Sequence, residues 1–514
     1  MSPGLTDLQL LVIGPNAQVA TYSGGGSASL KPYYAVAPLD AFREKLQDQK
    51  VSFAIGAQSH KQLPLVHNSW HTTSESSSKQ GLIFRAFNES HKAEKRTCVD
   101  ELYLTEAQCM FQDYYCPKLK SELWYADLEG YFIADRDGDY EVGLCVYGTA
   151  WLYCDDKLII DNATKQRQGT AFFGAGTEEE KAFISMKKGQ TYHFIVRFGS
   201  AETSTLKGAD VDFGGGAVRI GGAWRIDPEE EIENAASLAK SAEQVVICAG
   251  LNMDWESEGF DRDHMKLPGH MDAMISAVLE ANPNTVVVMQ SGTPVEMPWI
   301  KQCKGLLHAW YGGNETGNGI ADVLFGDINP SAKLSLSWPV KNEDNPAFLN
   351  YRSEAGRVLY GEDVYVGYRY YDTVKKEVEF PFGHGLSYTT FSFSDISVKN
   401  DGRDLNVSVK VSNTGENDGA QVVQVYLSQE KSKIRRPAKE MKGFGKVFLK
   451  KGQSEVVTVK IQTKYATSYF DEDRGQWIME AGTYKVIVND SSAVAEGALE
   501  AKFEIDQTSW WSGL

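Results

Sequence analysis

Several features that would assign a protein class at once are missing from this sequence. No apolar run reaches the about 18 residues that a membrane-spanning helix needs, so we expect no membrane partner. The seven cysteines contain no CxxC pair and no zinc-site spacing, so no metal is expected. Basic residues number 52 against 69 acidic ones, a net charge of −17, which argues against nucleic acid as a partner.

The sequence also lacks the motifs of nucleotide-binding loops. Gly24-Gly25-Gly26-Ser27 is rich in glycine, but it has neither the GxGxxG nor the GxxxxGK[ST] spacing, and no helix follows it at once. We therefore expect no cofactor. The first residues, MSPGLTDLQLLVIGPNA, lack the basic region and the cleavage site of a signal peptide, and the compartment stays open.

Five of the seven cysteines lie between positions 98 and 154. Buried thiols are the simpler interpretation of this cluster. One local disulfide among Cys98, Cys109 and Cys116 is the alternative, and the spacing alone leaves both open.

What is present is an ordinary globular composition over 514 residues, with 42% hydrophobic and 24% charged residues, enough for about three domains. Short apolar runs alternate with helical segments both before and after a long stretch of different pattern, from about residue 76 to 225. This pattern is typical of a parallel sheet covered by helices on both faces. The expected strands are 8–14, 245–250, 285–289, 305–310 and 333–338, and the expected helices are 38–47, 228–241, 269–281 and 320–325.

The interruption, from about residue 76 to 225, has a period of two and many turn residues, as in Tyr140–Val146 and Thr191–Phe198. It predicts an all-β module inserted into the α/β domain, because insertions succeed at exposed loop tips. Each flanking piece alone has too few strands to bury both faces of a sheet. The two pieces are therefore predicted to form one discontinuous domain.

Near the C-terminus, apolar residues at Leu405, Val407, Val409 and Val411 alternate with polar ones, which favours a sandwich of immunoglobulin or fibronectin type. A stretch rich in Tyr, Gly and Pro precedes it. The predicted fold is an α/β sandwich with a mostly parallel sheet, interrupted by an inserted β-sandwich and followed by a fibronectin type III-like β-sandwich. The predicted segments are α/β 1–75 and 226–340, insertion 76–225, ordered strap 341–393 and fibronectin type III-like domain 394–514.

In parallel sheets, ligands bind beyond the carboxyl ends of the strands. The loop Asp254–Arg262 follows one predicted strand and gathers Trp255, Glu256 and Glu258. One interpretation is a solvated acidic turn with an internal arginine pair. The other is a general acid, whose pKa an apolar neighbour raises, beside an aromatic platform for a sugar. A third loop, Gly312–Gly317, is either a site or a plain helix start.

Stretches along the whole chain resemble the C-terminal two-thirds of glycoside hydrolase family 3 β-glucosidases. They are IGPNA with GGGSA, WESEGFDRDHMKLPG, HAWYGGNETGNGIADVLFGDINPSAKLSLSWP and PFGHGLSYTTF. The inserted segment resembles a protective-antigen-like module found in one branch of that family. The tail resembles the family's fibronectin type III-like domain.

The resemblance implies a retaining hydrolase that releases terminal, non-reducing β-D-glucosyl residues in cellulose, glucan or glucoside breakdown. Such enzymes use two carboxylates about 5–5.5 Å apart. The family's acid/base position falls on Glu258, with Glu256 as the less favoured neighbour. Trp255 is the candidate sugar platform, and Arg262 is expected to pair with Asp261.

One departure from the family pattern is large. The family's nucleophile is an aspartate on an N-terminal (β/α)₈ barrel, and the 514 residues are already assigned to other domains. A missing barrel is therefore an implied partner, and we expect this chain alone to be inactive. A fragment, a truncated gene model and a split enzyme all fit this expectation. Family members are often secreted, and oligomeric state stays open.

Phe172 and Phe173 stand together in a loop bounded by Gly169 and Gly176. Adjacent residues of a strand face opposite sides, so one of the two rings is expected to be exposed. The resemblance implies that this module leans over the active site, where both rings would shape the site beyond the glucose. The alternative is that both rings pack under the module.

Two other functions remain as alternatives. A non-catalytic carbohydrate-binding protein would use the inserted module, where Asp155-Asp156 is either a calcium-binding pair or a simple β-turn. A structural or adhesive protein would have no use for the Glu258 loop.

Overall fold

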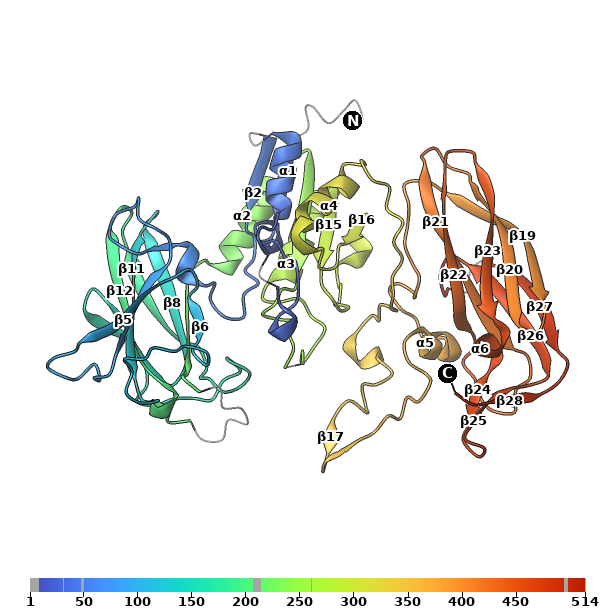
Figure 1. Ribbon diagram of the computed structural model, residues 1–514. Helices are drawn as coiled ribbons and strands as arrows, with labels where there is room; N and C mark the ends of the chain where they lie inside the picture. The colour runs from blue at the N-terminus through green and yellow to red at the C-terminus, as the bar shows by residue number, and fades with distance from the viewer. Residues whose placement is uncertain are drawn as a thin grey trace.

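The computed structural model describes residues 9–30, 32–47, 50–206, 214–259, 261–493 and 498–513. Three sheet-containing regions lie side by side, with a parallel sheet in the middle (Figure 1). The antiparallel strands from β3 to β13 lie on one side of it, and the C-terminal strands lie on the other.

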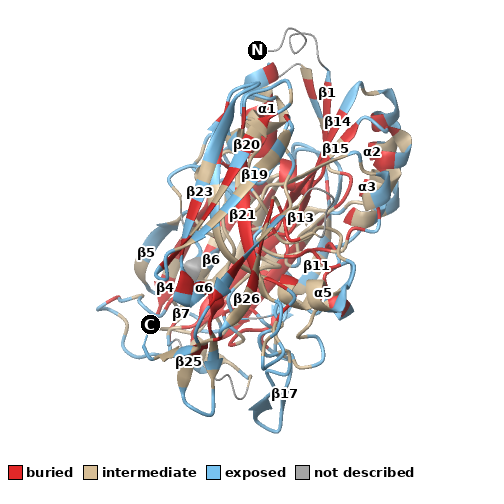
Figure 2. Cartoon of the chain, turned by 90° about the vertical axis from the view of Figure 1, so that its right-hand side faces the viewer, coloured by how far each residue is buried: buried red, intermediate tan, exposed pale blue. Residues whose placement is uncertain are grey.

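Five parallel strands form the central sheet in the order β16-β15-β14-β1-β2. Since β1 pairs with both β2 and β14, segments from both sides of the interruption share this sheet. Figure 2 shows β1, β14 and β15 next to each other. The strands are β1 (Leu10–Ile13), β2 (Val51–Ala54), β14 (Gln244–Gly250), β15 (Thr285–Gln290) and β16 (Gly305–His308).

Helices cover both faces of this sheet, which explains the unbroken apolar runs of its strands. Leu10 and Val12 pack toward α1 (Pro38–Leu46) and α4 (Thr316–Leu324). Leu11 and Ile13 point to the other face, toward α2 (Pro228–Ser241) and α3 (Met271–Ala281).

The expected strand at 333–338 is wrong. Its backbone hydrogen-bonds with the later segment around 380–384: Leu334 N–H donates to His384 O at 2.8 Å, and Trp338 N–H donates to Phe380 O at 2.8 Å. Side chains of this segment pack on the core, so the run is apolar without joining the sheet. β2 was not predicted from the sequence; Val51 and Ala54 at its ends are buried, Ser52 is exposed and Phe53 is half-buried.

Between β2 and β14 lie two antiparallel sheets, β10-β9-β12-β7-β4-β5 with β3 on β7, and β11-β8-β13-β6. Because β3 already pairs with β7, these sheets begin before residue 76. The strands are β3 (Trp70–His71), β4 (Leu82–Phe87), β5 (Cys98–Leu104), β6 (Gln108–Met110), β7 (Tyr125–Ile133), β8 (Gly138–Tyr147), β9 (Thr149–Cys154), β10 (Lys157–Asn162), β11 (Glu180–Met186), β12 (Thr191–Gly199) and β13 (Ala217–Trp224).

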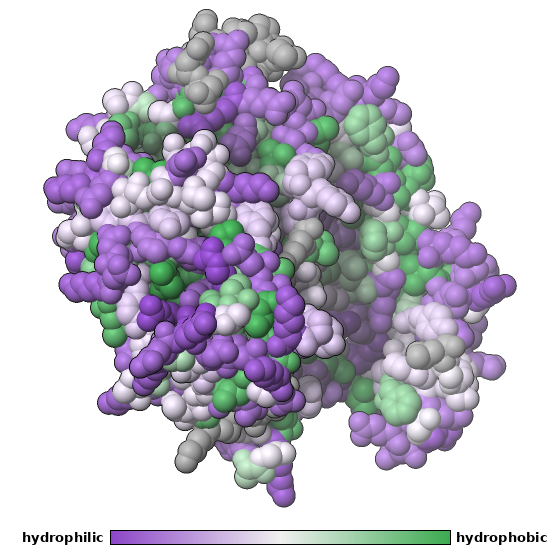
Figure 3. Space-filling view, turned by 60° about the vertical axis from the view of Figure 1, so that its left-hand side comes forward, coloured by the Kyte–Doolittle hydropathy of each residue, from purple (hydrophilic) through white to green (hydrophobic). Residues whose placement is uncertain are grey.

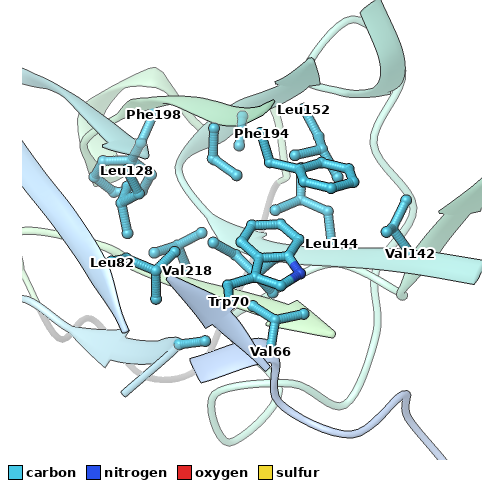
Figure 4. Packing of buried hydrophobic residues seen from close by; sticks show 14 of the residues in the cluster. Val66, Trp70, Leu82, Leu128, Val142, Leu144, Leu152, Phe194, Phe198 and Val218 are labelled. Carbon is cyan, nitrogen blue, oxygen red and sulfur yellow. The ribbon is translucent and has the colours of Figure 1, made fainter. Parts of the chain in front are cut away.

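Trp70 lies at the centre of the core between these two sheets. Its fully buried ring stacks on Phe194, with ring centroids 4.3 Å apart. Figure 4 shows Phe194 on one side of this ring and Val66 on the other. The alternating burial along β7 reflects one face that packs on this core and one that faces outward.

The structure answers two smaller questions that the sequence left open. All seven cysteines are free thiols, so the alternative of a disulfide among Cys98, Cys109 and Cys116 is wrong. Asp155 and Asp156 both have positive φ, 47° and 63°, in the two-residue turn between β9 and β10. Turns of this kind favour aspartate at such positions, so the two residues form a β-turn. Among the described residues, no three His, Cys, Asp or Glu side chains are grouped so that they could hold a metal ion.

The C-terminal region packs the sheet β19-β20-β23 against the sheet β22-β21-β26-β27. A third small sheet, β24-β25-β28, follows. The strands are β19 (Phe391–Asn400), β20 (Asp404–Asn413), β21 (Gly419–Gln429), β22 (Glu440–Leu449), β23 (Ser454–Gln462), β24 (Tyr469–Asp471), β25 (Gln476–Met479), β26 (Gly482–Asn489), β27 (Leu499–Ile505) and β28 (Ser509–Trp511), with α6 (Thr463–Thr467) between β23 and β24.

The segment before it carries α5 (Tyr368–Val374) and the exposed hairpin of β17 (Ser353–Glu354) and β18 (Arg357–Val358) (Figure 2). The face drawn in Figure 3 is mainly hydrophilic, with hydrophobic side chains in scattered groups. Among the described residues, no helix is long and apolar enough to cross a membrane.

Trp70→Ala is expected to destabilise the inserted sheets by about 3–5 kcal/mol, because it removes a fully buried indole ring from their core. Native-state hydrogen exchange of the β7 and β12 amides measures this change. Tyr115→Ala is the control: Tyr115 is 83% exposed, so its loss should stay within about 0.5 kcal/mol. Equal effects of the two substitutions would contradict this account of the core.

Candidate active site

Two loops meet at the carboxyl edge of the central sheet. One follows β1 and contains Gly24–Ser27; the other follows β14 and contains Glu256 and Glu258. Because β1 and β14 are parallel neighbours, both loops leave the sheet at the same edge. They join by a backbone bridge between Gly25 and Ser257, and Gly25 N–H donates to Glu256 O at 2.9 Å.

The glycines of the first loop are required by this close approach. A Cβ at Gly25 would lie 2.7 Å from the Met253 carbonyl oxygen, and a Cβ at Gly26 would lie 2.4 Å from the Glu258 Cβ. Gly26 also has a φ of +85°, which residues with a side chain rarely adopt. The glycine-rich motif thus serves tight packing against the Glu258 loop.

Glu258 is exposed, and the first loop holds its carboxylate. Ser27 donates two hydrogen bonds to Glu258 Oε2, one from its backbone N–H at 2.8 Å and one from its hydroxyl. Both bonds favour the charged form and lower the pKa of Glu258. The sequence interpretation expected an apolar neighbour to raise the pKa of Glu258; the structure differs because the two hydrogen bonds from Ser27 outweigh the effect of burial on this carboxylate.

Glu256 has a different environment. Gly292 N–H donates to its carboxylate at 2.7 Å, and the hydroxyls of Thr293 and Tyr311 donate to it as well. Burial and the nearby Glu256 carboxylate raise the pKa of the Tyr311 phenol. Glu256 therefore has its oxygens occupied by the protein and acts as an anchor for the loop.

The expected ion pair between Arg262 and Asp261 is wrong. Arg262 Nη1 donates to Thr293 Oγ1 at 2.9 Å and lies 4.0 Å from Glu256 Oε1, and burial lowers its pKa. Asp261 instead accepts a hydrogen bond from Tyr351, which raises the pKa of that phenol. Two neighbours in sequence point to different parts of the fold, which the spacing did not reveal.

Trp255 packs against the core below the central sheet, and its indole N–H donates to the Ser59 carbonyl oxygen. The Lys61 ammonium lies 5.9 Å from the ring centroid. This side chain is not among the residues that line the cavity beside Glu258. The structure therefore does not bring Trp255 together with the other candidate residues.

A cavity of about 440 Å³ lies between the Glu258 loop and the inserted sheets. Glu258, Asp254 and Met253 line one side of it. The inserted sheets supply the opposite side, which is lined by Gln108, Met110, Phe172, Phe173 and Arg219.

The two phenylalanines differ in exposure. Phe172 is 7% exposed and packs with Cys145, Ala171 and Ala217, whereas Phe173 is 49% exposed. A Cβ placed on Gly259 would lie 3.6 Å from the Phe173 ring, so this ring reaches the residue next to Glu258. Both residues have positive φ in a turn, so strand alternation is not the cause of their opposite environments.

Arg219 and Asp254, which the sequence interpretation did not single out together, form a polar part of the cavity wall; Arg219 is buried and Asp254 is half-buried. Arg219 donates to Glu179 at 3.1 Å and to the Leu63 carbonyl oxygen at 2.7 Å. Burial raises the pKa of Asp254, and the charge of Arg219 opposes that shift. These groups come from β13 and from the loop after β14, so only the folded chain brings them together.

Substitution of the two glutamates should have different effects on the free energy of unfolding. Glu256→Ala is expected to destabilise the protein by at least about 2 kcal/mol, because the Tyr311 hydroxyl and the Gly292 N–H lose a charged acceptor. Glu258→Ala should have a much smaller effect, since that side chain is exposed and water can replace it as the acceptor for Ser27. Urea denaturation of both variants decides this; a larger loss for Glu258→Ala would contradict the assignment of roles.

Comparisons with known proteins show which family the chain belongs to. The glycosyl hydrolase family 3 C-terminal domain matches residues 5–388, and a fibronectin type III-like domain matches residues 421–492. A probable beta-glucosidase I of Aspergillus clavatus is 52% identical over 98% of this chain, and one of Aspergillus niger is 49% identical over 99%. These matches cover 60% and 62% of the two relatives, so the chain spans about three-fifths of their length.

Solved structures agree with this result. A beta-glucosidase from Kluyveromyces marxianus in complex with glucose matches all of this chain and 61% of its own, with a TM-score of 0.92 at 42% identity. DesR, a beta-glucosidase from Streptomyces venezuelae in complex with D-glucose, matches 96% of this chain and 56% of its own, with a TM-score of 0.64 at 26% identity. Because the family's domain covers most of its residues, the chain belongs to glycosyl hydrolase family 3.

Proposed function

We propose that this chain supplies the acid/base carboxylate and the leaving-group side of a retaining β-glucosidase site. Its substrates would be β-glucosides and oligosaccharides, from which a terminal non-reducing β-D-glucosyl residue is released. The observation that carries the proposal is the position of Glu258, an exposed carboxylate held at the edge of a cavity between two modules. The names of the relatives support the choice of substrate.

In this scheme Glu258 protonates the glycosidic oxygen as the bond breaks, and then takes a proton from the water that releases the glucose. A second carboxylate must act as nucleophile, about 5–5.5 Å away. Asp254 is the other carboxyl that lines the cavity among the described residues. Burial raises its pKa, which disfavours the charged form that a nucleophile needs.

The nucleophile is therefore proposed to come from a barrel like that of the family, in the two-fifths of the relatives that this chain does not match. We further propose that the α/β segments on the two sides of the insertion act as one rigid support for the loops. The inserted segment would be a protective-antigen-like module that forms the second wall, with Phe172, Phe173 and Arg219 toward the leaving group.

A direct test compares this chain alone with the same chain co-expressed with the unmatched part of the Aspergillus clavatus relative. The chain alone should hydrolyse an aryl β-glucoside far below the about 10 s⁻¹ that is typical of enzymes, because the nucleophile is missing. Co-expression should restore turnover. Turnover near the typical value by the chain alone would overturn the assignment of the nucleophile.

Glu258→Gln in the complemented enzyme should lower kcat/KM for a glucose disaccharide by about 10²–10⁴-fold, because a sugar leaving group must be protonated. A dinitrophenyl β-glucoside, whose leaving group departs without a proton, should lose far less in the first step. The matched control is Glu416→Gln, at a side chain that is 82% exposed in the C-terminal region. An equal loss on both substrates would argue against an acid/base role.

Phe173→Ala should weaken the preference among leaving groups without destabilising the fold, because the ring is exposed and lies near Gly259. We expect KM for a disaccharide to rise by about 10-fold, the loss typical of one hydrophobic contact in a specificity pocket, with kcat for an aryl glucoside little changed. Phe172→Ala serves as the comparison, since its buried ring should affect stability first. Unchanged ratios between disaccharide and longer substrates in both variants would contradict the proposed wall.

A further inference from the structure

The glycine-rich loop after β1 has a feature that tight packing alone does not require. Its three glycines bring the backbone against the Glu258 loop, and Ser27 follows them at the point of closest approach. Ser27 is exposed, so its hydroxyl has water as an alternative partner. It faces the Glu258 carboxylate instead and donates a hydrogen bond to it.

Both donors of Ser27 converge on the same oxygen. The backbone N–H lies 2.8 Å from Glu258 Oε2, and the hydroxyl also donates to Oε2. Among the residues that the structure describes, no donor is assigned to Oε1. A second backbone contact, from Glu258 N–H to Gly25 O at 3.4 Å, holds the residue in this position.

We propose that Ser27 is a positioning residue for Glu258, an inference that rests on the proposed function. Its two donors commit Oε2 to accepting hydrogen bonds and leave Oε1 as the oxygen that gives the proton to the leaving group and takes it back from water.

The chemistry of the carboxyl group supports this division of roles. A protonated carboxyl carries one O–H, and each oxygen has two lone-pair sites. Two donors already fill the sites of Oε2, so a proton placed there would have to displace one of them. A proton on Oε1 displaces neither bond. Ser27 therefore selects the oxygen and also fixes the plane of the carboxyl group.

The same bonds favour the charged form of Glu258, consistent with its lowered pKa. Three other ionisable side chains line this cavity: Asp254, Lys61 and Arg219. Arg219 is engaged by Glu179, and burial raises the pKa of Asp254. Ser27 is thus the neighbour whose removal acts most directly on Glu258. Loss of its hydroxyl should raise the pKa of Glu258 and let it stay protonated to higher pH.

The first test uses this chain as it is and needs no activity. The carboxyl carbon of Glu258 is titrated by NMR in protein labelled with ¹³C at the glutamate side chain, and Glu258→Gln assigns its signal. Ser27→Ala should shift the midpoint upward by about one pH unit, the size expected for losing one hydrogen bond to a charged group. Ser27→Thr keeps a hydroxyl and should restore most of the shift.

Ser29→Ala is the matched control, because Ser29 lines the same cavity but its hydroxyl donates to the Gly26 carbonyl oxygen at 2.6 Å. It should leave the midpoint in place. A midpoint in Ser27→Ala equal to that of the unchanged chain, or equal shifts in both variants, would overturn the proposal.

The second test uses the complemented enzyme and separates this proposal from the proposed function. Ser27→Ala should move the basic limb of the kcat/KM profile to higher pH by the same amount as the NMR midpoint, because that limb reports the acid in the free enzyme. KM for an aryl glucoside should change little. A shifted midpoint with an unshifted limb would support the Ser27 contact and overturn Glu258 as the acid.

Discussion

The parallel pairing of β1 with β14 is the constraint on which the site depends. These strands belong to segments that the inserted sheets separate, and their register aligns Leu10 with Gln244 and Ile13 with Ile247. Both strands therefore end at the same edge, and the loops that follow them have to share the space beyond it. The glycines of the first loop resolve that crowding, because a single Cβ at Gly26 would collide with Glu258. Without this pairing, the two loops would not share one edge of the sheet, and Ser27 would not contact Glu258.

The sequence predicted most of the regular structure wherever a local signal was strong. The helix 228–241 agrees with α2, whose N-cap residue Asp227 accepts from the backbone of its first turn. β2 was missed because a four-residue strand leaves too little pattern to separate it from a loop. The segment 333–338 was misassigned for the opposite reason. Its apolar period is real, but its hydrogen-bond partners lie some 45 residues later at 380–384, and no local signal carries that information.

The residues of the candidate site also differ in whether the sequence carries a local signal for them. Glu258 was chosen over Glu256 through the resemblance to a family, and the structure separates them physically: one carboxylate is exposed and the other is saturated by Tyr311, Thr293 and Gly292. The roles of Ser27 and Arg219 were invisible in the sequence. Each acts on a residue more than 30 positions away, and neither stands in a recognisable spacing with its partner.

The two walls of the cavity differ in how they are held, and this difference bears on what each can do. On the Glu258 side, backbone hydrogen bonds join the loop after β1 to the Glu258 loop, and both loops leave the central sheet at the same edge. This support positions the carboxylate, and proton transfer depends on such positioning. The opposite side reaches the cavity through a turn at Phe172 and Phe173, where backbone with positive φ carries one buried and one exposed ring. A turn tolerates changes of sequence that a paired strand does not. Under the proposed function, the chemistry would therefore sit on the rigid wall, and the choice of leaving group would sit on the wall that can change without disturbing it.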